Sequence, residues 1–305
     1  MTHIRKAVFP VAGMGTRFLP ATKSIPKEML PLVDRPLIQY AVDEARAAGI
    51  EEVIFVTAVG KGALEDYFDT ATALEQRLVA NGKTDALAAM DRTRMPEGAL
   101  SFVRQNAPLG LGNAVRIARR LVGDEPFAVL LPDDVIRAPQ GALAQMVAAH
   151  AKTRGHMVAT MDVPRQDTSS YGILDVAQQN GRLTRAKGLV EKPRPDMAPS
   201  TSAVVGRYIL EPSIFARLAD LSPGAGGELQ LTDAINADVE QIGVTGYHFE
   251  GERYDCGSVL GFVQATVAFA LDRPELQVDL RRFIDALAAL YRGTVMRQHF
   301  ALVMP

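Results

Sequence analysis

The chain has 305 residues, 22% of them charged, with a net charge of −2 and one cysteine. A nearly neutral charge excludes the broad basic surface that holds nucleic acid or acidic membranes. No apolar run has the length of a membrane span, and the N-terminus lacks the apolar core of a signal peptide. Cys256 cannot form an intrachain disulfide, and no histidine motif pairs with it, so we expect a small buried residue rather than a nucleophile. We therefore expect a cytoplasmic protein that binds neither nucleic acid nor membrane.

Strands and helices alternate along the first half of the chain. In order, we expect a strand at 7–11, a helix at 36–48, a strand at 53–58, two or three short surface helices within 61–93, a strand at 99–103, a helix at 112–121 and a strand at 127–131. Strands that are separated by helices form a parallel sheet with crossovers. The pattern predicts an α/β fold with a Rossmann-like, doubly wound sheet, and ligands of such sheets bind beyond the carboxyl ends of the strands.

The second half of the chain is richer in strands, so we expect a mixed sheet flanked by helices. Strands are expected at 157–163, 172–177, 182–190, 203–209, 242–249 and 252–255, with helices at 211–219 and 231–240. A helical tail follows over 259–291, with a break at 272–274. No linker-like shift in composition separates the halves, which favours one composite domain over two independent ones.

The loop after the first strand carries the strongest functional signal. It reads GMGTRFLPATKSIPKEMLP from residue 13 to residue 31. Gly13 and Gly15 allow backbone N–H groups to approach an anion, and Arg17 and Lys27 bring positive charge to it. The natural ligand of such a loop is the polyphosphate of a nucleoside triphosphate.

Two commoner phosphate-binding loops do not match this stretch. The P-loop requires a second glycine followed by Lys-Ser or Lys-Thr at a spacing that is absent here. The dinucleotide fingerprint requires a third glycine where Phe18 stands, and a helix start that Pro20 and Pro26 prevent. A glycine-rich connection without a ligand is the remaining alternative, and two cations in one loop make it the weaker one.

A second informative stretch, RQNAPLGLGN at 104–113, follows the strand at 99–103. The Gln105 amide offers the donor and acceptor pair that reads a pyrimidine edge, and Gly110 lets the backbone approach the same ring. An ordinary strand-to-helix connection uses the same glycines, so that alternative stays open here.

Carboxylates at two places suggest a cation site. Asp133 and Asp134 follow the buried strand at 127–131, and Asp255 lies in a distant segment. The five histidines show no metal-ligand spacing, so we expect oxygen ligands and a hard cation such as Mg²⁺. A solvated turn that uses aspartate as a cap is the competing interpretation.

Glu191 and Lys192 close the strand at 182–190. Neighbouring residues on a strand point to opposite faces, unless a twist or bulge turns both toward the cleft. There the glutamate could accept hydrogen bonds from sugar hydroxyls, while the lysine neutralises a phosphate. A solvent-exposed edge of mixed charge is the alternative. Gly172 and Gly206 mark further close approaches of the backbone.

Taken in order, eight stretches resemble the sugar-1-phosphate nucleotidyltransferase family, and within it the bacterial UTP–glucose-1-phosphate uridylyltransferases. They are GMGTRFLPATKSIPKEMLPLVDRPLIQY (13–40), RQNAPLGLGNAV (104–115), LLPDD (130–134), YGILD (171–175), GLVEKP (188–193), VVGRYIL (204–210), GGELQLTDAI (226–235) and YDCGSVLGF (254–262). The thymidylyltransferases share the nucleotide loop. The PATKSIPKEMLPLVD segment and the inserted helices near 61–93 resemble the uridylyltransferase branch better.

The resemblance implies a GT-A-like nucleotidyltransferase domain over 1–270 and a helical tail over 271–305. The nucleotide-binding part would cover about 1–135, and the sugar-phosphate-binding part about 136–270. The substrates would be UTP and glucose 1-phosphate, the products UDP-glucose and pyrophosphate, and the cofactor Mg²⁺. A sugar phosphate is largely dianionic at pH 7 and needs no general base, which agrees with the lack of a catalytic histidine.

The resemblance also implies a role for each matching residue. The catalytic residues would be Arg17, Lys27 and Lys192, and the metal would be held by Asp133 and Asp255. The nucleotide would contact Ala12, Gly13, Gly15, Glu28, Gln105 and Gly110. The sugar phosphate would contact Gly172, Glu191, Lys192 and Gly206.

Three alternatives compete with this interpretation. A thymidylyltransferase, or an enzyme for another sugar 1-phosphate, would also use Gln105, which reads a feature common to uracil and thymine. A glycosyltransferase would need an Asp-x-Asp spacing that Asp133 and Asp134 lack. A non-catalytic sensor of nucleotide sugars could dispense with the cations that stabilise a leaving group.

The tail predicts an oligomer contact. Leu280, Phe283, Ile284, Leu287, Ala288 and Tyr291 recur at helical spacing and form one broad apolar face. The face either packs on its own domain or joins a neighbouring subunit. Because symmetric oligomers are common among soluble enzymes, we expect a homodimer or homotetramer.

Overall fold

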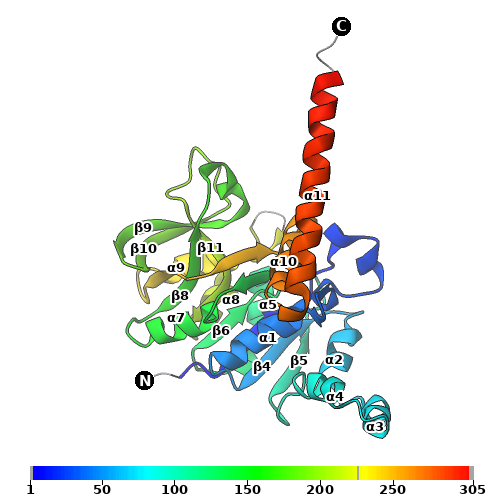
Figure 1. The fold of residues 1–305 in the computed structure, drawn as a ribbon. Coiled ribbons are helices and arrows are strands. Elements are labelled where there is room, and N and C mark those ends of the chain that lie inside the picture. Colours follow the sequence, from blue (N-terminus) through cyan, green and yellow to red (C-terminus); the bar gives the residue numbers. More distant parts are fainter. Residues whose placement is uncertain (1–2, 225–226, 302–305) are drawn as a thin grey trace.

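Within residues 3–224 and 227–301, the part that the computed structural model describes, nine strands form one mixed sheet (Figure 1). Their order is β5 (Leu100–Arg104), β4 (Glu52–Thr57), β1 (Lys6–Pro10), β6 (Phe127–Leu130), β11 (Ser202–Leu210), β8 (His156–Asp162), β12 (Val244–His248), β10 (Leu183–Glu191) and β9 (Gly172–Asn180). The first four are parallel, which confirms the doubly wound half of the predicted sheet. β11 runs antiparallel to both β6 and β8, so the sheet is mixed, as predicted.

Helices cover both faces of the sheet. One face carries α1 (Leu37–Ala47), α2 (Gly62–Phe68) and α7 (Ala142–His150), and the other carries α5 (Leu111–Ile117), α8 (Ile214–Asp220) and α9 (Leu231–Asp238). Phe9 of β1 belongs to the first core and its neighbour Val8 to the second, because successive residues of a strand point to opposite faces. The sequence did not predict α7.

Three further helices lie in the first half of the chain. α3 (Thr72–Ala80) and α4 (Thr84–Asp91) have no buried residue, and together with α2 they confirm the short helices predicted within 61–93. α6 (Arg119–Val122) continues the chain after α5.

Two short strand pairs lie outside the nine-stranded sheet, and of their four strands the sequence predicted only β13 (Glu252–Asp255). β2 (Pro31–Leu32) and β3 (Arg35–Pro36) enclose a tight turn in which Val33 has a φ of 64°. β7 (Asp134–Arg137) pairs antiparallel with β13 (Glu252–Asp255), and their register sets Asp134 opposite Asp255. The second aspartate of the Asp-Asp pair therefore begins a strand, whereas the sequence had predicted only a turn there.

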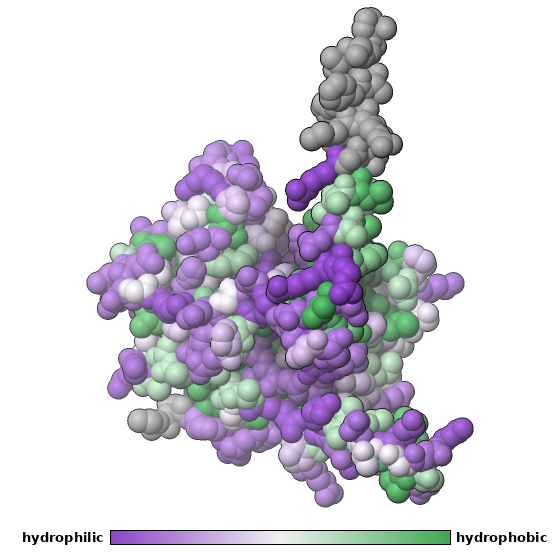
Figure 2. All heavy atoms as spheres, in the orientation of Figure 1, coloured by the Kyte–Doolittle hydropathy of each residue, from purple (hydrophilic) through white to green (hydrophobic). Residues whose placement is uncertain are grey.

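The C-terminal helices are α10 (Val259–Leu271) and α11 (Pro274–Ala301), which confirm the helical tail and its break at 272–274. α10 packs on the body, where Ala265 joins a small core with Leu32 and Leu37. α11 projects away from the body (Figure 1), and its described part carries apolar side chains on the surface (Figure 2). Among the helices within 3–224 and 227–301, none is both long and apolar enough to cross a membrane.

Candidate active site

Two adjoining cavities open at the carboxyl ends of the central strands. The first, of about 300 Å³, is lined by six predicted site residues: Ala12, Gly13, Lys27, Gln105, Gly110 and Asp133. The second, of about 480 Å³, is lined by six others: Arg17, Gly172, Glu191, Lys192, Gly206 and Asp255. Leu111, Leu131 and Glu228 line both cavities, so the two form one cleft. The structure thus brings together predicted residues from seven separate stretches of the chain.

The glycine loop follows β1 and turns Lys27 into the cleft. It contains three 3₁₀ turns, at Thr16–Phe18, Ala21–Lys23 and Lys27–Met29, in keeping with its prolines. The Lys27 ammonium lies 2.6 Å from Oδ2 of Asp133. Burial disfavours the charge on the lysine, but attraction to Asp133 and Glu28 outweighs it and raises the pKa of Lys27. Lys27 is therefore a fixed cation in the first cavity.

Asp133 and Asp255 converge on Gly257. A Cβ built at Gly257 would lie 3.0 Å from an oxygen of each carboxylate, so these two oxygens are no more than twice that distance apart. Although burial works against ionisation, the Lys27 ammonium lowers the pKa of Asp133. Asp133 is thus an anion at neutral pH. The small glycine leaves room between the two carboxylates.

This donor set fits a hard cation that keeps other ligands. Within the described part of the chain, no three histidine, cysteine or acidic residues are grouped as a protein-only metal cage would need. Mg²⁺ is commonly held by only one or two carboxylates together with water and substrate phosphates. Asp133 and Asp255 meet that requirement. The pair therefore fits the predicted magnesium site.

Glu191 and Lys192 both line the second cavity, although they are neighbours at the end of β10. Lys192 has a φ of 46°, the left-handed conformation that non-glycine residues rarely adopt. This backbone conformation breaks the alternation of a regular strand, which would point the two neighbouring side chains to opposite faces of the sheet. A Cβ at Gly172 would lie 3.3 Å from Oε2 of Glu191, so the glycine leaves space beside the carboxylate.

The Gln105 and Gly110 loop closes the other end of the cleft. The backbone N–H of Gln105 donates to the Thr57 carbonyl at 2.8 Å, which fixes the start of the loop at the end of β4. Gly110 has a φ of 89°, and a Cβ there would lie 2.9 Å from the Leu229 carbonyl. Only glycine suits this position without a shift of the backbone.

Comparison with known proteins agrees with this geometry. The sequence profile of the family described as nucleotidyl transferase matches residues 6–270. The chain belongs to this family. The UTP–glucose-1-phosphate uridylyltransferase of Komagataeibacter xylinus is 51% identical over 84% of this chain and 90% of its own length. The resemblance inferred from the motifs is confirmed.

Solved structures of this nucleotidyl transferase family also match. The UTP-bound UGPase from Acinetobacter baumannii is 42% identical, with a TM-score of 0.86 over 92% of this chain and 98% of that one. A UDP-glucose pyrophosphorylase complexed with UDP-glucose is 42% identical, with a TM-score of 0.79 over 88% of this chain and 100% of that one. These matches confirm the predicted nucleotidyltransferase fold.

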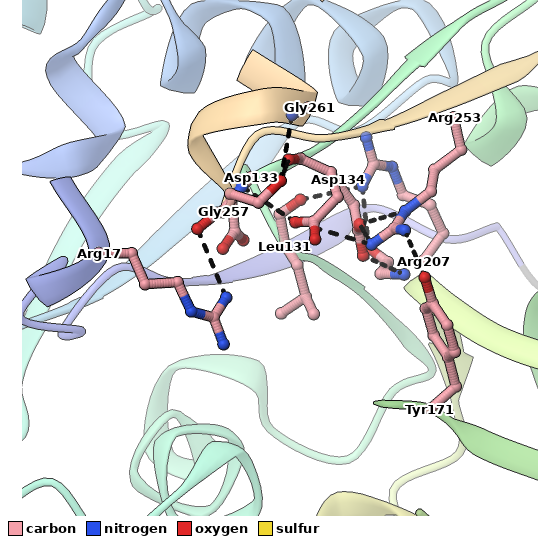
Figure 3. Close-up of polar contacts among 12 residues, drawn as sticks. Arg17, Leu131, Asp133, Asp134, Tyr171, Arg207, Arg253, Gly257 and Gly261 are labelled. Atoms are coloured by element: carbon pink, nitrogen blue, oxygen red, sulfur yellow. Dashed lines mark hydrogen bonds and ion pairs between the residues drawn. The ribbon is translucent and has the colours of Figure 1, made fainter. Parts of the chain in front are cut away.

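Three predicted site residues of this nucleotidyl transferase lie elsewhere than expected. Gly15 and Glu28 line neither cavity, and Arg17 lines the second cavity rather than the first. Gly15 has a φ of 66°, and a Cβ there would lie 3.0 Å from Cβ of Lys27. Glu28 is buried in an ion pair with Lys61 at 2.7 Å. The guanidinium of Arg17 is 3.4 Å from the Gly257 carbonyl (Figure 3).

Asp134 and Arg253 shape the site. The sequence analysis named Asp134 only beside Asp133, as a carboxylate for a cation, and it gave Arg253 no role. Asp134 accepts the Gly206 N–H at 2.8 Å and forms an ion pair with Arg253. Arg253 in turn donates to the Tyr171 hydroxyl at 3.0 Å and lines the second cavity (Figure 3). The only signal in the sequence was the position of Arg253 two residues before Asp255.

A buried ion pair ties this site to α1. Arg207 is 1% exposed; its Nη2 donates to Glu44 of α1 at 2.7 Å, and its Nη1 donates to the Leu131 carbonyl at 3.1 Å. Leu131 stands at the strand end that leads to Asp133. Cys256, next to Asp255, is fully buried, and burial raises the pKa of its thiol to about 12, which agrees with the prediction that it is not a nucleophile.

Proposed function

We propose that this nucleotidyl transferase transfers the uridylyl group of UTP to glucose 1-phosphate and gives UDP-glucose and pyrophosphate. The 51% identity to a UTP–glucose-1-phosphate uridylyltransferase over most of both chains is the observation that carries the proposal. The paired cavities support it, since one holds the amide suited to a pyrimidine and the other holds the Glu191 and Lys192 pair suited to a sugar phosphate.

The chain's own residues bring two anions together. Lys192 neutralises the phosphate of glucose 1-phosphate, and Glu191 accepts hydrogen bonds from the sugar hydroxyls. A phosphate oxygen of the dianionic sugar phosphate attacks the α-phosphorus of UTP, so the new P–O bond forms as the bond to the departing pyrophosphate breaks. Arg17 and Lys27 stabilise the charge that develops on the pyrophosphate. No proton transfer is required of the protein.

The remaining assignments follow the predicted roles. Ala12, Gly13 and Gly110 border the nucleotide, Gln105 reads the uracil edge, and Gly172 and Gly206 border the glucose. Asp133 and Asp255 would hold Mg²⁺, which would supply positive charge to neutralise the phosphate oxygens. For Glu28 and Gly15 we propose indirect roles. Glu28 helps to raise the pKa of Lys27, and Gly15 lets the loop backbone pass close to the Lys27 side chain.

The division of the chain follows from the same proposal. The nucleotide-binding part covers about 1–135, the sugar-phosphate-binding part about 136–270, and the tail 271–305 is separate from both. We also propose that α11 joins a second copy of the chain in a homodimer or homotetramer, because Phe283 is 60% and Tyr291 65% exposed. The cytoplasmic location stays a prediction from cysteine use.

Product analysis tests the reaction directly. UTP, Mg²⁺ and one sugar 1-phosphate at a time are incubated with the protein, and nucleotide sugars are separated by chromatography. We expect UDP-glucose from glucose 1-phosphate. Formation of a different UDP-sugar at a higher rate would move the proposal to that sugar phosphate.

A further inference from the structure

We propose that a third cavity, separate from the catalytic cleft, binds a small organic phosphate that carries hydroxyl groups. Its volume is about 540 Å³, within the range of small-molecule sites. Its walls come from β3 and the turn before it, from α1 and α2, from α4 and the residues that follow it, and from Arg273 between α10 and α11. Helices α1, α2 and α4 lie near one another in Figure 1. We call it the α1–α4 cavity. It shares no lining residue with either cavity of the cleft.

Two buried polar atoms at the α1–α4 cavity lack hydrogen-bond partners. Among the described residues, three buried side-chain nitrogen or oxygen atoms have none, and two of them are Nε of Arg35 and Oε1 of Gln39, both from lining residues. The Gln39 amide nitrogen donates to Asp43 at 2.6 Å, so its oxygen still requires a donor. Arg35 Nε lies 3.8 Å from Oδ1 of Asp34, which is too long for a hydrogen bond.

Such unpaired groups disfavour the empty state of the cavity. A buried donor or acceptor without a partner is costly, and Gln39 is only 1% exposed in a helix whose buried face is otherwise apolar. A ligand with an anionic oxygen for Arg35 and a hydroxyl for Gln39 would satisfy both. Side-chain adjustments of the size needed to meet a ligand are common on binding.

The charge of the α1–α4 cavity favours an anion. Arg273 is paired with Asp34, and Arg35 donates to Asp43 at 3.1 Å. Within the described part of the chain, the guanidinium of Arg92 has no hydrogen bond or ion pair, and it also lines the cavity. Among the lining residues alone, two neutralised pairs and one free arginine leave a net positive charge. A planar guanidinium matches a phosphate through two parallel hydrogen bonds.

The remaining wall favours an organic ligand over inorganic phosphate. Tyr67 and Met90 contribute apolar surface, and no side-chain hydrogen bond of the Tyr67 hydroxyl exists within the described residues. Burial raises the pKa of Tyr67 to about 12, so this hydroxyl keeps its proton at neutral pH. A phosphorylated sugar supplies the phosphate, the hydroxyl donors and the carbon skeleton that these groups would contact.

Calorimetric titration of the full chain with ribose 5-phosphate tests this site. We expect one bound molecule per chain, weaker binding of inorganic phosphate, and a dissociation constant raised about tenfold or more by Arg92→Ala, since hydrogen bonds to charged groups are the strong ones. Gln39→Leu should weaken binding as well. Lys192→Ala, in the catalytic cleft, and Arg154→Ala, a matched exposed arginine at another cavity, should bind like the wild type.

Three results would overturn the inference. The first is no binding at about 10 mM ribose 5-phosphate, beyond the millimolar range of weak ligands. The second is a loss of binding in Lys192→Ala with retention in Arg92→Ala, which would put the probe in the catalytic cleft. The third is equal binding by the wild type and Arg92→Ala. Arg92 is exposed, so Arg92→Ala should fold normally. This variant therefore tests the site even if Gln39→Leu fails to fold.

Discussion

The carboxylate of Asp134 accepts the backbone N–H of Gly206 at 2.8 Å, although 72 positions separate the two residues in the chain. The same carboxylate binds Arg253, whose guanidinium reaches the Tyr171 hydroxyl at 3.0 Å. One buried side chain therefore connects β11, β13 and the segment before β9. These are the walls that surround the proposed sugar phosphate, so the shape of the second cavity depends on this contact.

We predict that Gly206→Ala weakens sugar-phosphate binding. The added methyl carbon would lie 2.5 Å from Oδ2 of Asp134 and 2.7 Å from Cβ of Leu131, so the cavity wall must shift. Overpacking of this kind costs about 1–3 kcal/mol. We expect a KM for glucose 1-phosphate raised about tenfold and a lower Tm, measured by steady-state kinetics and thermal unfolding.

Gly188→Ala is the matched control for that variant. Gly188 also lies in a strand of the sheet, but the nearest atom to its added carbon would be 3.4 Å away. Its KM should stay close to the wild-type value. A wild-type KM in Gly206→Ala as well would show that the contact with Asp134 does not shape the sugar-phosphate site.

We predict that Lys192→Ala lowers kcat/KM for glucose 1-phosphate by about 10²–10³, because removal of one preorganised charge-stabilising group has this effect. Lys187→Ala should stay within about twofold. Lys187 of β10 forms an exposed ion pair with Asp175 of β9 at 3.4 Å, and exposed ion pairs contribute little. Circular dichroism should show the same fold for both. Near-normal turnover in Lys192→Ala would remove this lysine from the mechanism.

The buried His156 should make stability depend on pH. Its Nδ1 accepts the Glu211 N–H at 3.1 Å, and its Nε2 lies 3.0 Å from Asp238, which Arg217 also contacts. Burial lowers the pKa of His156 despite the opposing effect of Asp238, and the nearby His150 lowers it further. At a pH below 6.5, the ordinary pKa of histidine, residue 156 is therefore more protonated in the unfolded chain than in the folded protein. Stability is lost as the pH falls through 6.5.

The measurement is urea unfolding between pH 7 and pH 5. One such histidine contributes at most about 1.4 kcal/mol of unfolding free energy per pH unit. His156→Gln should flatten the decline, and His3→Gln, which replaces an exposed histidine, should leave it unchanged. The pKa of Asp238 is lowered, so its own effect falls at more acidic pH than this window. Equal slopes in the wild type and His156→Gln would contradict the assignment.

Light scattering tests the proposed role of α11. The wild type should show a mass of two or four times 32.9 kDa. Phe283→Asp should shift the particle toward a single chain because it places a charge on the exposed apolar face. Arg281→Ala changes an exposed polar position of the same helix and should not dissociate the assembly. A single-chain mass for the wild type at working concentration would refute the oligomer.

Local features of the sequence predicted most of the cleft. The residues after β1, β5 and β6 were placed correctly because parallel strands end at the same edge of a sheet, and each loop follows its strand directly. The pairing of β7 with β13 could not be predicted, since strands of four residues over 110 positions apart leave little local signal. The role of Arg253 depends on that pairing. The positive φ of Lys192 could not be predicted either, because lysine is not a residue type that favours this conformation.

Local backbone conformation explains why two predicted site residues, Glu28 and Gly15, do not reach a cavity wall. Glu28 follows Lys27 directly, but the tight 3₁₀ turn sends its side chain inward to Lys61. Gly15 shapes the loop through its positive φ and its closeness to Lys27. A motif shows which residues occur together, whereas the backbone conformation decides which of them face the ligand.

Pyrophosphate release with UTP and with dTTP, measured side by side with glucose 1-phosphate and Mg²⁺, is the most direct test of the proposed function. Both nucleotides present the same base edge to Gln105, so the comparison tests whether the site has room for the 5-methyl group of thymine. We predict a strong preference for UTP. Equal or faster release with dTTP would contradict the uridylyltransferase and place the chain with the thymidylyltransferases of the same fold.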